Sequence, residues 1–188
     1  MIHRRSCIGA VSSGMLGALH CILADAATPK IHAGRDLPFD MKPMPVQVRP
    51  ALASASLAPV AIDLSQFRGS WVYLDFWASW CAPCRQSFDW MNRWHQQFAP
   101  RGLQVVAVGL DQQRQAMDAF LRSNPSTFWV LWDASGQWAR AMQVKAMPTS
   151  FLVSPSGQVI SEHRGFSSAI AESVERELGA VLSSKGGA

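Results

Sequence analysis

Residues 71–84 of the chain read WVYLDFWASWCAPC. The first seven positions form a nearly continuous apolar and aromatic run, interrupted by Asp75, which is typical of a strand buried on both faces of a sheet. Cys81 and Cys84 follow directly. Beyond them, apolar side chains recur at helical spacing, namely Phe88, Met91, Trp94 and Phe98. The stretch therefore predicts a buried strand, a pair of cysteines, and a helix that begins at the pair.

The same alternation of strand and helix patterns continues on both sides of this stretch. Upstream, residues 65–68 predict a short helical turn. Downstream, we expect strands at 103–110, 127–132, 150–153 and 158–161, and helices at 113–122, 136–144 and 168–182. This order implies a central mixed sheet with parallel crossovers and one antiparallel hairpin at its end, covered by helices on both faces. The fold class is an α/β sandwich.

The first 60 residues have a different character. Residues 1–26 combine a basic head, a short apolar stretch and the cleavage pattern Ala24-Asp25-Ala26, which predicts a secretory signal peptide and a periplasmic or secreted protein. An uncleaved N-terminal membrane anchor is the alternative. Residues 27–60 contain six prolines and predict a linker or an extended arm; a short strand around 45–49 is an alternative left open. The folded domain is then expected at 61–188.

Composition excludes several classes of function. The chain is 48% hydrophobic, enough to form a core, and its net charge of +4 comes from scattered Lys and Arg, so we expect no nucleic-acid partner. Four cysteines are too few for a disulfide scaffold. Two of them, Cys7 and Cys21, lie in the predicted signal peptide. After its cleavage Cys81 and Cys84 would be the two remaining cysteines, so any function of the cysteines rests on this pair.

The position of the cysteine pair points to redox chemistry. Free amide groups and the dipole at a helix N-terminus favour a thiolate on Cys81, and Pro83 is tolerated in a first helical turn. A zinc site would need two more ligands, and no second pair is present in the sequence. An inert structural disulfide is disfavoured because the loop it closes is minimal. We expect no cofactor beyond the redox-active Cys81–Cys84 disulfide.

Two motifs together resemble the thioredoxin superfamily: DFWASWCAPC at 75–84, and MPTSFLV at 147–153 followed by Gly157. The lead-in DLSQFRGSW, and an extra strand and helix between Leu110 and Gln143, are most similar to TlpA/ResA-like extracytoplasmic thiol-disulfide oxidoreductases. The resemblance covers about residues 61–182. It implies a thioredoxin-like fold in which the central mixed sheet carries this strand and helix as an insertion.

The resemblance also assigns roles to individual residues. It implies that Cys81 attacks the substrate, that Cys84 resolves the mixed disulfide, and that Pro148 is a cis-proline facing the dithiol. Met147 would contact the substrate and tune redox behaviour. Pro83 and Trp80 complete the expected substrate-binding residues; Trp80 is expected at the surface.

Asp75 matches the buried acid of cytoplasmic thioredoxins, but the sequence departs from the family around it. Ala107 stands where thioredoxins have a lysine partner for this acid, and Ser87 replaces the usual Glu after the second cysteine. Ala146 occupies the usual glycine position. Burial without a cationic partner should raise the pKa of Asp75 and allow it to take the Cys84 proton as a general base. An acid that is merely hydrogen-bonded in the core is the alternative.

Other polar residues favour structural roles. Asp111 and Asp133 follow predicted strands and are expected to serve turns or helix caps. His95 and His163 have no evident catalytic partner in the sequence and are expected at the surface.

We therefore predict a secreted thiol-disulfide oxidoreductase, acting as a monomer, that reduces disulfides in exported proteins. The resemblance implies a membrane dithiol reductase as electron donor and protein substrates that include apocytochrome c. One alternative is a binding module, such as a copper chaperone, that uses both thiolates with a nearby Met. Another is a non-catalytic assembly protein.

Overall fold

The structure is a computed structural model that describes residues 34–38, 43–48 and 61–183. The predicted signal peptide lies outside these residues, as does most of the predicted arm. The strands are β1 (Met44–Val48), β2 (Ala61–Ile62), β3 (Trp71–Trp77), β4 (Leu103–Gly109), β5 (Trp129–Trp132), β6 (Thr149–Val153) and β7 (Val159–Arg164). The helices are α1 (Ala82–Phe98), α2 (Arg114–Ser123), α3 (Gln137–Ala141) and α4 (Ser168–Ser183), with 3₁₀ turns η1 (Leu64–Phe67) and η2 (Ala99–Arg101).

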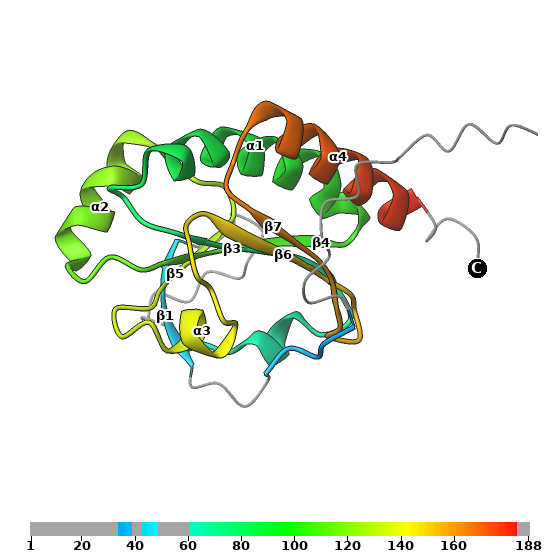
Figure 1. Cartoon of the computed structure of the whole chain (residues 1–188), viewed down its shortest axis with the longest axis horizontal. Coiled ribbons are helices and arrows are strands. Elements are labelled where there is room, and N and C mark those ends of the chain that lie inside the picture. Colours follow the sequence, from blue (N-terminus) through cyan, green and yellow to red (C-terminus); the bar gives the residue numbers. More distant parts are fainter. Residues whose placement is uncertain (1–33, 39–42, 49–60, 184–188) are drawn as a thin grey trace, which may run out of the picture.

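The strands form one mixed seven-stranded sheet in the order β2-β1-β5-β4-β3-β6-β7. Strands β3, β4 and β5 are parallel, whereas β6 runs antiparallel to β3 and makes the predicted hairpin with β7. Helices lie on both sides of the sheet, with α1 and α4 on one side and α3 on the other (Figure 1). The predicted thioredoxin-like α/β fold is confirmed.

Each face of the sheet has its own apolar core, because alternate residues of a strand point to opposite faces. The face under α1, α2 and α4 is called here the α1/α4 face; Tyr73 and Trp77 of β3 pack there against Cys84, Phe88 and Trp94 of α1. The opposite face buries Leu74 and Phe76 against η1 and α3. Strand β3 is therefore buried on both sides, as its continuous apolar run predicts.

Strand β1 lies inside the sheet, paired antiparallel with β2 on one side and with β5 on the other. It is the short strand expected around residues 45–49. Leu37 of the preceding segment is also buried, in the core beneath η1 and α3. The described parts of this N-terminal region therefore pack against the rest of the molecule.

Helix α3 is shorter than predicted and ends at Ala141 rather than near Val144. Gln143 adopts a left-handed conformation with φ of 57°, which cannot continue a helix. The start of α3 follows the expectation for Asp133, whose carboxylate accepts hydrogen bonds from the amides of Gln137, Trp138 and Ala139 at 2.9, 2.8 and 3.2 Å.

The prediction that His95 and His163 are surface residues is wrong, since they are only 9% and 7% exposed. His95 follows Trp94 on the buried side of α1, and burial lowers its pKa. His163 lies on β7, and its Nε2 is 3.2 Å from Oε2 of Glu177 on α4. The burial of His163 depends on α4 lying over β7, which the sequence does not reveal. His95 instead lies four residues after Met91 and three before Phe98, within the apolar side of α1.

Candidate active site

Cys81 and Cys84 form a disulfide at the start of α1, with their Cα atoms 5.3 Å apart. Cys81 is the N-cap residue of the helix, and Pro83 occupies its first turn, where a missing amide proton costs no helical hydrogen bond. Cys81 is 6% exposed, whereas Cys84 is fully buried. Cys81 is therefore the sulfur closer to solvent, in agreement with the predicted order of attack.

The loop between β3 and α1 is held by Asp111, which follows β4. The Asp111 carboxylate accepts hydrogen bonds from the Ser79 amide at 3.0 Å and from its hydroxyl at 2.6 Å. The next residue, Trp80, is 69% exposed, as predicted. Beside it lies a surface hollow of about 330 Å³, also lined by Leu110 and Gln112. An exposed aromatic side chain and this hollow thus adjoin the cysteine pair.

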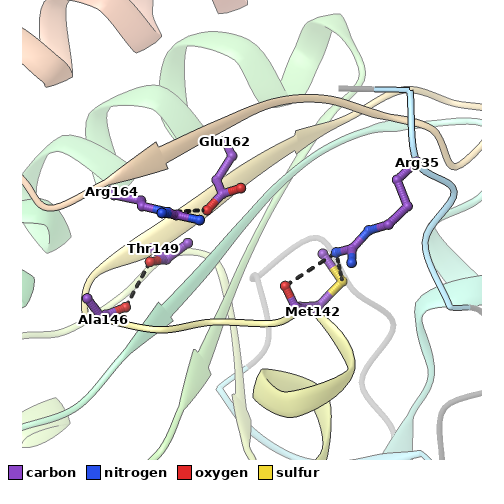
Figure 2. A network of polar contacts seen from close by, with 6 residues as sticks. All are labelled: Arg35, Met142, Ala146, Thr149, Glu162 and Arg164. Carbon is purple, nitrogen blue, oxygen red and sulfur yellow. Dashed lines mark hydrogen bonds and ion pairs between the residues drawn. The ribbon is translucent and has the colours of Figure 1, made fainter. Parts of the chain in front are cut away.

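The loop before β6 reaches the same end of the sheet. Thr149 pairs with Phe76 near the end of β3, so Met147 and Pro148 lie beside the turn that leads to Cys81. The Met147–Pro148 peptide bond is cis. The Thr149 hydroxyl donates to the Ala146 carbonyl at 2.8 Å, spanning the two residues (Figure 2). Met147 is partly buried against the core that contains both cysteines.

Two further polar contacts lie on the elements before and after this loop (Figure 2). Before it, the Arg35 guanidinium donates to the Met142 carbonyl at 3.3 Å, which joins the N-terminal segment to the end of α3. Beyond it, Arg164 of β7 donates through Nε to Oε1 of the buried Glu162 at 2.6 Å. The Arg35 contact thus ties the N-terminal segment to α3, whereas the Arg164–Glu162 pair is local to β7.

Asp75 is buried beneath α1, with an exposed fraction of 1%. It lies opposite Ala107 on β4 and opposite Ser150 on β6. Its Oδ2 has no hydrogen-bond partner among the described residues, and burial raises the pKa of this carboxyl well above its usual value. The prediction of a raised pKa for Asp75 is confirmed. Ala107, the residue opposite it on β4, has no charge that could offset this shift.

The residues that sequence analysis missed lie on the same face as Asp75. The Tyr73 hydroxyl donates to Ser150 Oγ at 2.8 Å, and His163 lies opposite Ser150 on the next strand. Burial, and to a smaller degree the charge of Asp75, raise the pKa of Tyr73. The two-residue spacing of Tyr73 and Asp75 indicates their shared face, but no local pattern predicts that Ser150 and His163 join them.

A family model described as AhpC/TSA matches residues 50–162, more than half of the chain. The chain belongs to the AhpC/TSA family. The predicted resemblance to thioredoxin-like, ResA-like proteins is also confirmed by individual relatives of this AhpC/TSA protein. Thiol-disulfide oxidoreductase ResA of Bacillus subtilis (strain 168) is 35% identical over 99 residues, covering 53% of this chain and 55% of the relative.

Two further relatives show the same likeness. ResA of Bacillus thuringiensis subsp. konkukian (strain 97-27) is 33% identical over 104 residues, covering 55% of this chain and 60% of its own length. A solved structure from Chlorobium tepidum, described as a thiol:disulfide interchange protein DsbE, is 41% identical with a TM-score of 0.67, covering 80% of this chain and 97% of that chain. The chain thus spans less than two thirds of the length of these two curated relatives.

Proposed function

We propose that this AhpC/TSA-family protein is a thiol-disulfide oxidoreductase that reduces disulfides in exported proteins. The observation that carries the proposal is the Cys81–Cys84 disulfide at the N-terminus of α1, with Cys81 toward solvent and Cys84 buried behind it. A helix N-terminus stabilises a thiolate on the first cysteine. The relatives named ResA and DsbE add support for thiol-disulfide chemistry.

The reaction transfers two electrons from the dithiol to the substrate. The Cys81 thiolate attacks one sulfur of the substrate disulfide; the other sulfur leaves as a thiolate and takes a proton from water. Cys84 then loses its proton to the ionised form of Asp75 and attacks the Cys81 sulfur. This second attack breaks the mixed disulfide and expels the second substrate sulfur as a thiolate, which takes a proton from water. The protein ends as the Cys81–Cys84 disulfide and needs a dithiol donor to restore it.

The surroundings of Cys81 favour the reducing direction. Ala82 and Pro83 carry no charge that could stabilise the thiolate beyond the helix N-terminus. The helix N-terminus should therefore lower the pKa of the Cys81 thiol only moderately, and less than in strongly oxidising relatives. A less stabilised thiolate gives the couple a lower reduction potential, and the reduced protein then donates electrons.

Substrate recognition is assigned to the residues that surround the disulfide. Trp80 offers an exposed aromatic surface directly before Cys81, and Pro83 follows in the first turn. On the other side, the backbone of Met147, which precedes Pro148, would pair with an extended substrate segment by strand addition. The proposed partners are a membrane dithiol reductase as donor and exported cysteine proteins, including apocytochrome c, as acceptors.

Extracytoplasmic location is part of the proposal and rests on the leader pattern in residues 1–26. Within the described part of the chain, no helix has the length and apolar character needed to span a bilayer. The intact mass and the N-terminal sequence of the protein recovered from the periplasm test the location. A mature chain that begins after Ala26 supports it, and a chain that retains Met1 and sediments with membranes contradicts it.

Cysteine variants test the activity. Cys81→Ser should abolish insulin-disulfide reduction, whereas Cys84→Ser should accumulate mixed disulfides through Cys81. The reduction potential measured against glutathione gives the direction of electron flow. The proposal fails if Cys84→Ser traps no substrate and the wild-type protein oxidises reduced substrates efficiently. Stoichiometric copper retained through desalting, without disulfide reduction, would instead indicate the metal-binding alternative.

Asp75→Asn tests the proposed general base. This variant should slow the resolving attack by Cys84 near neutral pH more than the first attack by Cys81, because only the resolving step sends a proton to Asp75. Equal slowing of the two steps would contradict this role for Asp75.

A further inference from the structure

A row of polar side chains crosses the α1/α4 face of the sheet from Asp75 to α4. Asp75 on β3 lies directly opposite Ser150 on β6, and Ser150 lies directly opposite His163 on β7. Opposite residues of antiparallel strands place their Cβ atoms about 4.5–5.5 Å apart. At the end of the row, His163 Nε2 is 3.2 Å from Glu177 Oε2 on α4. The four residues thus form a row of neighbours that runs from the buried acid to a helix at the edge of the sheet.

Three polar groups along the row are free to exchange a proton: the Ser150 hydroxyl, Asp75 Oδ2 and His163 Nδ1. Tyr73 donates its hydroxyl hydrogen to Ser150, so the hydrogen of Ser150 remains free to be donated elsewhere. Asp75 Oδ2 and His163 Nδ1, one on each side of Ser150, are buried without a hydrogen-bond partner among the described residues. When Nε2 of a neutral imidazole donates to Glu177, Nδ1 is an acceptor. Buried polar atoms without partners are rare and require an explanation.

The elements around Asp75 offer few other titratable groups. On β4 its neighbour is Ala107, and the buried side chains of α2 and α4 are apolar. The titratable side chains on the buried side of α1 are Cys84 and His95. His95 lies 11 residues beyond Cys84, which at 1.5 Å per residue is about 16 Å along the helix. Glu177, in contrast, reaches solvent, with 22% of its side chain exposed.

We infer that Ser150, His163 and Glu177 form a proton route that connects Asp75 with solvent during resolution of the mixed disulfide. This inference rests on the proposed function. The carboxyl of Asp75 gives its proton to Ser150 Oγ while the Ser150 hydrogen passes to His163 Nδ1. His163 Nε2 passes its own hydrogen to Glu177, which releases it to water. The ionised Asp75 then accepts the proton of Cys84. One proton has then passed from Cys84 to solvent, and the hydrogen of His163 has moved from Nε2 to Nδ1.

Tyr73 acts as a positioning residue in this route. Its hydroxyl is fixed by the bond to Ser150, and its ring packs edge-on against Trp94 with centroids 5.1 Å apart. Because Tyr73 occupies one lone pair of Ser150, the Ser150 hydrogen is directed to the carboxyl or to the imidazole. Ser150, His163 and Glu177 act through Asp75 and touch neither the substrate nor the reacting sulfurs.

A stopped-flow reaction of the reduced protein with stoichiometric 5,5′-dithiobis(2-nitrobenzoic acid) separates the two chemical steps. The first release of thionitrobenzoate reports attack by Cys81, and the second reports resolution by Cys84. We expect Ser150→Ala and His163→Ala to slow the second release about tenfold at neutral pH and to leave the first unchanged, because a proton route supports acid–base catalysis. Ser150→Thr keeps the hydroxyl and should remain within about twofold of wild type.

The chain offers a matched control for each variant. Ser161→Ala removes a buried hydroxyl from β7 two residues before His163, and His95→Ala removes a buried imidazole of similar exposure. Both controls should keep the wild-type rate of the second release. Added imidazole should accelerate the second release in His163→Ala and not in His95→Ala. Glu177→Gln should also slow the second release. Because Glu177 is partly exposed on α4, this variant still tests the route if His163→Ala fails to fold.

The outcomes distinguish the proton route from the proposed function. If the wild-type protein releases no second thionitrobenzoate, both fail. If it does, but the row variants match wild type, or the two control variants slow the second release as much, the proton route is refuted and thiol-disulfide exchange stands. The proton route is also refuted if His163→Ala slows the second release but does not respond to added imidazole, and Glu177→Gln releases the second thionitrobenzoate at the wild-type rate.

Discussion

Asp75→Asn should change the pH dependence of stability in a defined direction. Burial raises the folded-state pKa of Asp75, whereas the unfolded chain keeps a pKa of about 3.9. Between these two values the folded protein holds a proton that the unfolded chain has lost. The stability associated with this carboxyl is therefore fully present below the unfolded pKa and is lost as pH rises toward the folded pKa. Asn has nearly the same shape and does not titrate.

The magnitude follows from the burial of the side chain and from its lack of a cationic neighbour. Asp75 is 1% exposed and lies opposite Ala107, so neither solvent nor a paired charge offsets the cost of ionisation. The wild-type protein should lose about 1.4 kcal/mol of unfolding free energy relative to Asp75→Asn for each pH unit between the two pKa values. The variant thus gains relative stability as pH rises from 5 to 7.

Denaturant unfolding of the oxidised proteins at several pH values measures this difference. Keeping the disulfide intact removes the titration of Cys81 and Cys84 from the comparison. All other titrating groups are shared by the two proteins, so their contributions cancel in the difference. Unfolding free energies that run parallel from pH 5 to 7 would refute the argument, because they would mean that Asp75 ionises as easily in the folded protein as in the unfolded chain.

Three further substitutions test the site and its support. Trp80→Ala should change the unfolding free energy by less than about 0.5 kcal/mol, because the side chain is 69% exposed, yet lower kcat/KM for insulin; an unchanged kcat/KM would remove Trp80 from substrate binding. Asp133→Ala should cost about 1–2 kcal/mol in denaturant unfolding, since three amides of α3 lose their acceptor. Phe88→Ala should cost about 3–5 kcal/mol in the same assay, because its buried ring packs with centroid distances of 4.5 Å to Trp77 and 4.9 Å to Phe120. A loss below about 1 kcal/mol would contradict this packing.

The sequence by itself determines the elements that carry the cysteine pair. A strand buried on both faces must be apolar along its length, and a helix on a sheet must repeat apolar residues at helical spacing, so residues 71–77 and 82–98 can be read locally. Asp75 is conspicuous for the same reason, as a charge within a continuous apolar strand. The raised pKa follows from that position and from Ala107, once the family resemblance aligns the two.

Only the tertiary structure decides which distant side chains share a face with Asp75. Strand register is fixed by pairing between segments far apart in the chain, and a shift of one residue would turn Ser150 and His163 to the other side of the sheet. The burial of His163 depends on α4 lying over β7, and the support of the Trp80 loop depends on Asp111 at the end of a neighbouring strand. Such contacts leave no periodic pattern in the sequence, because each one joins single residues from separate elements.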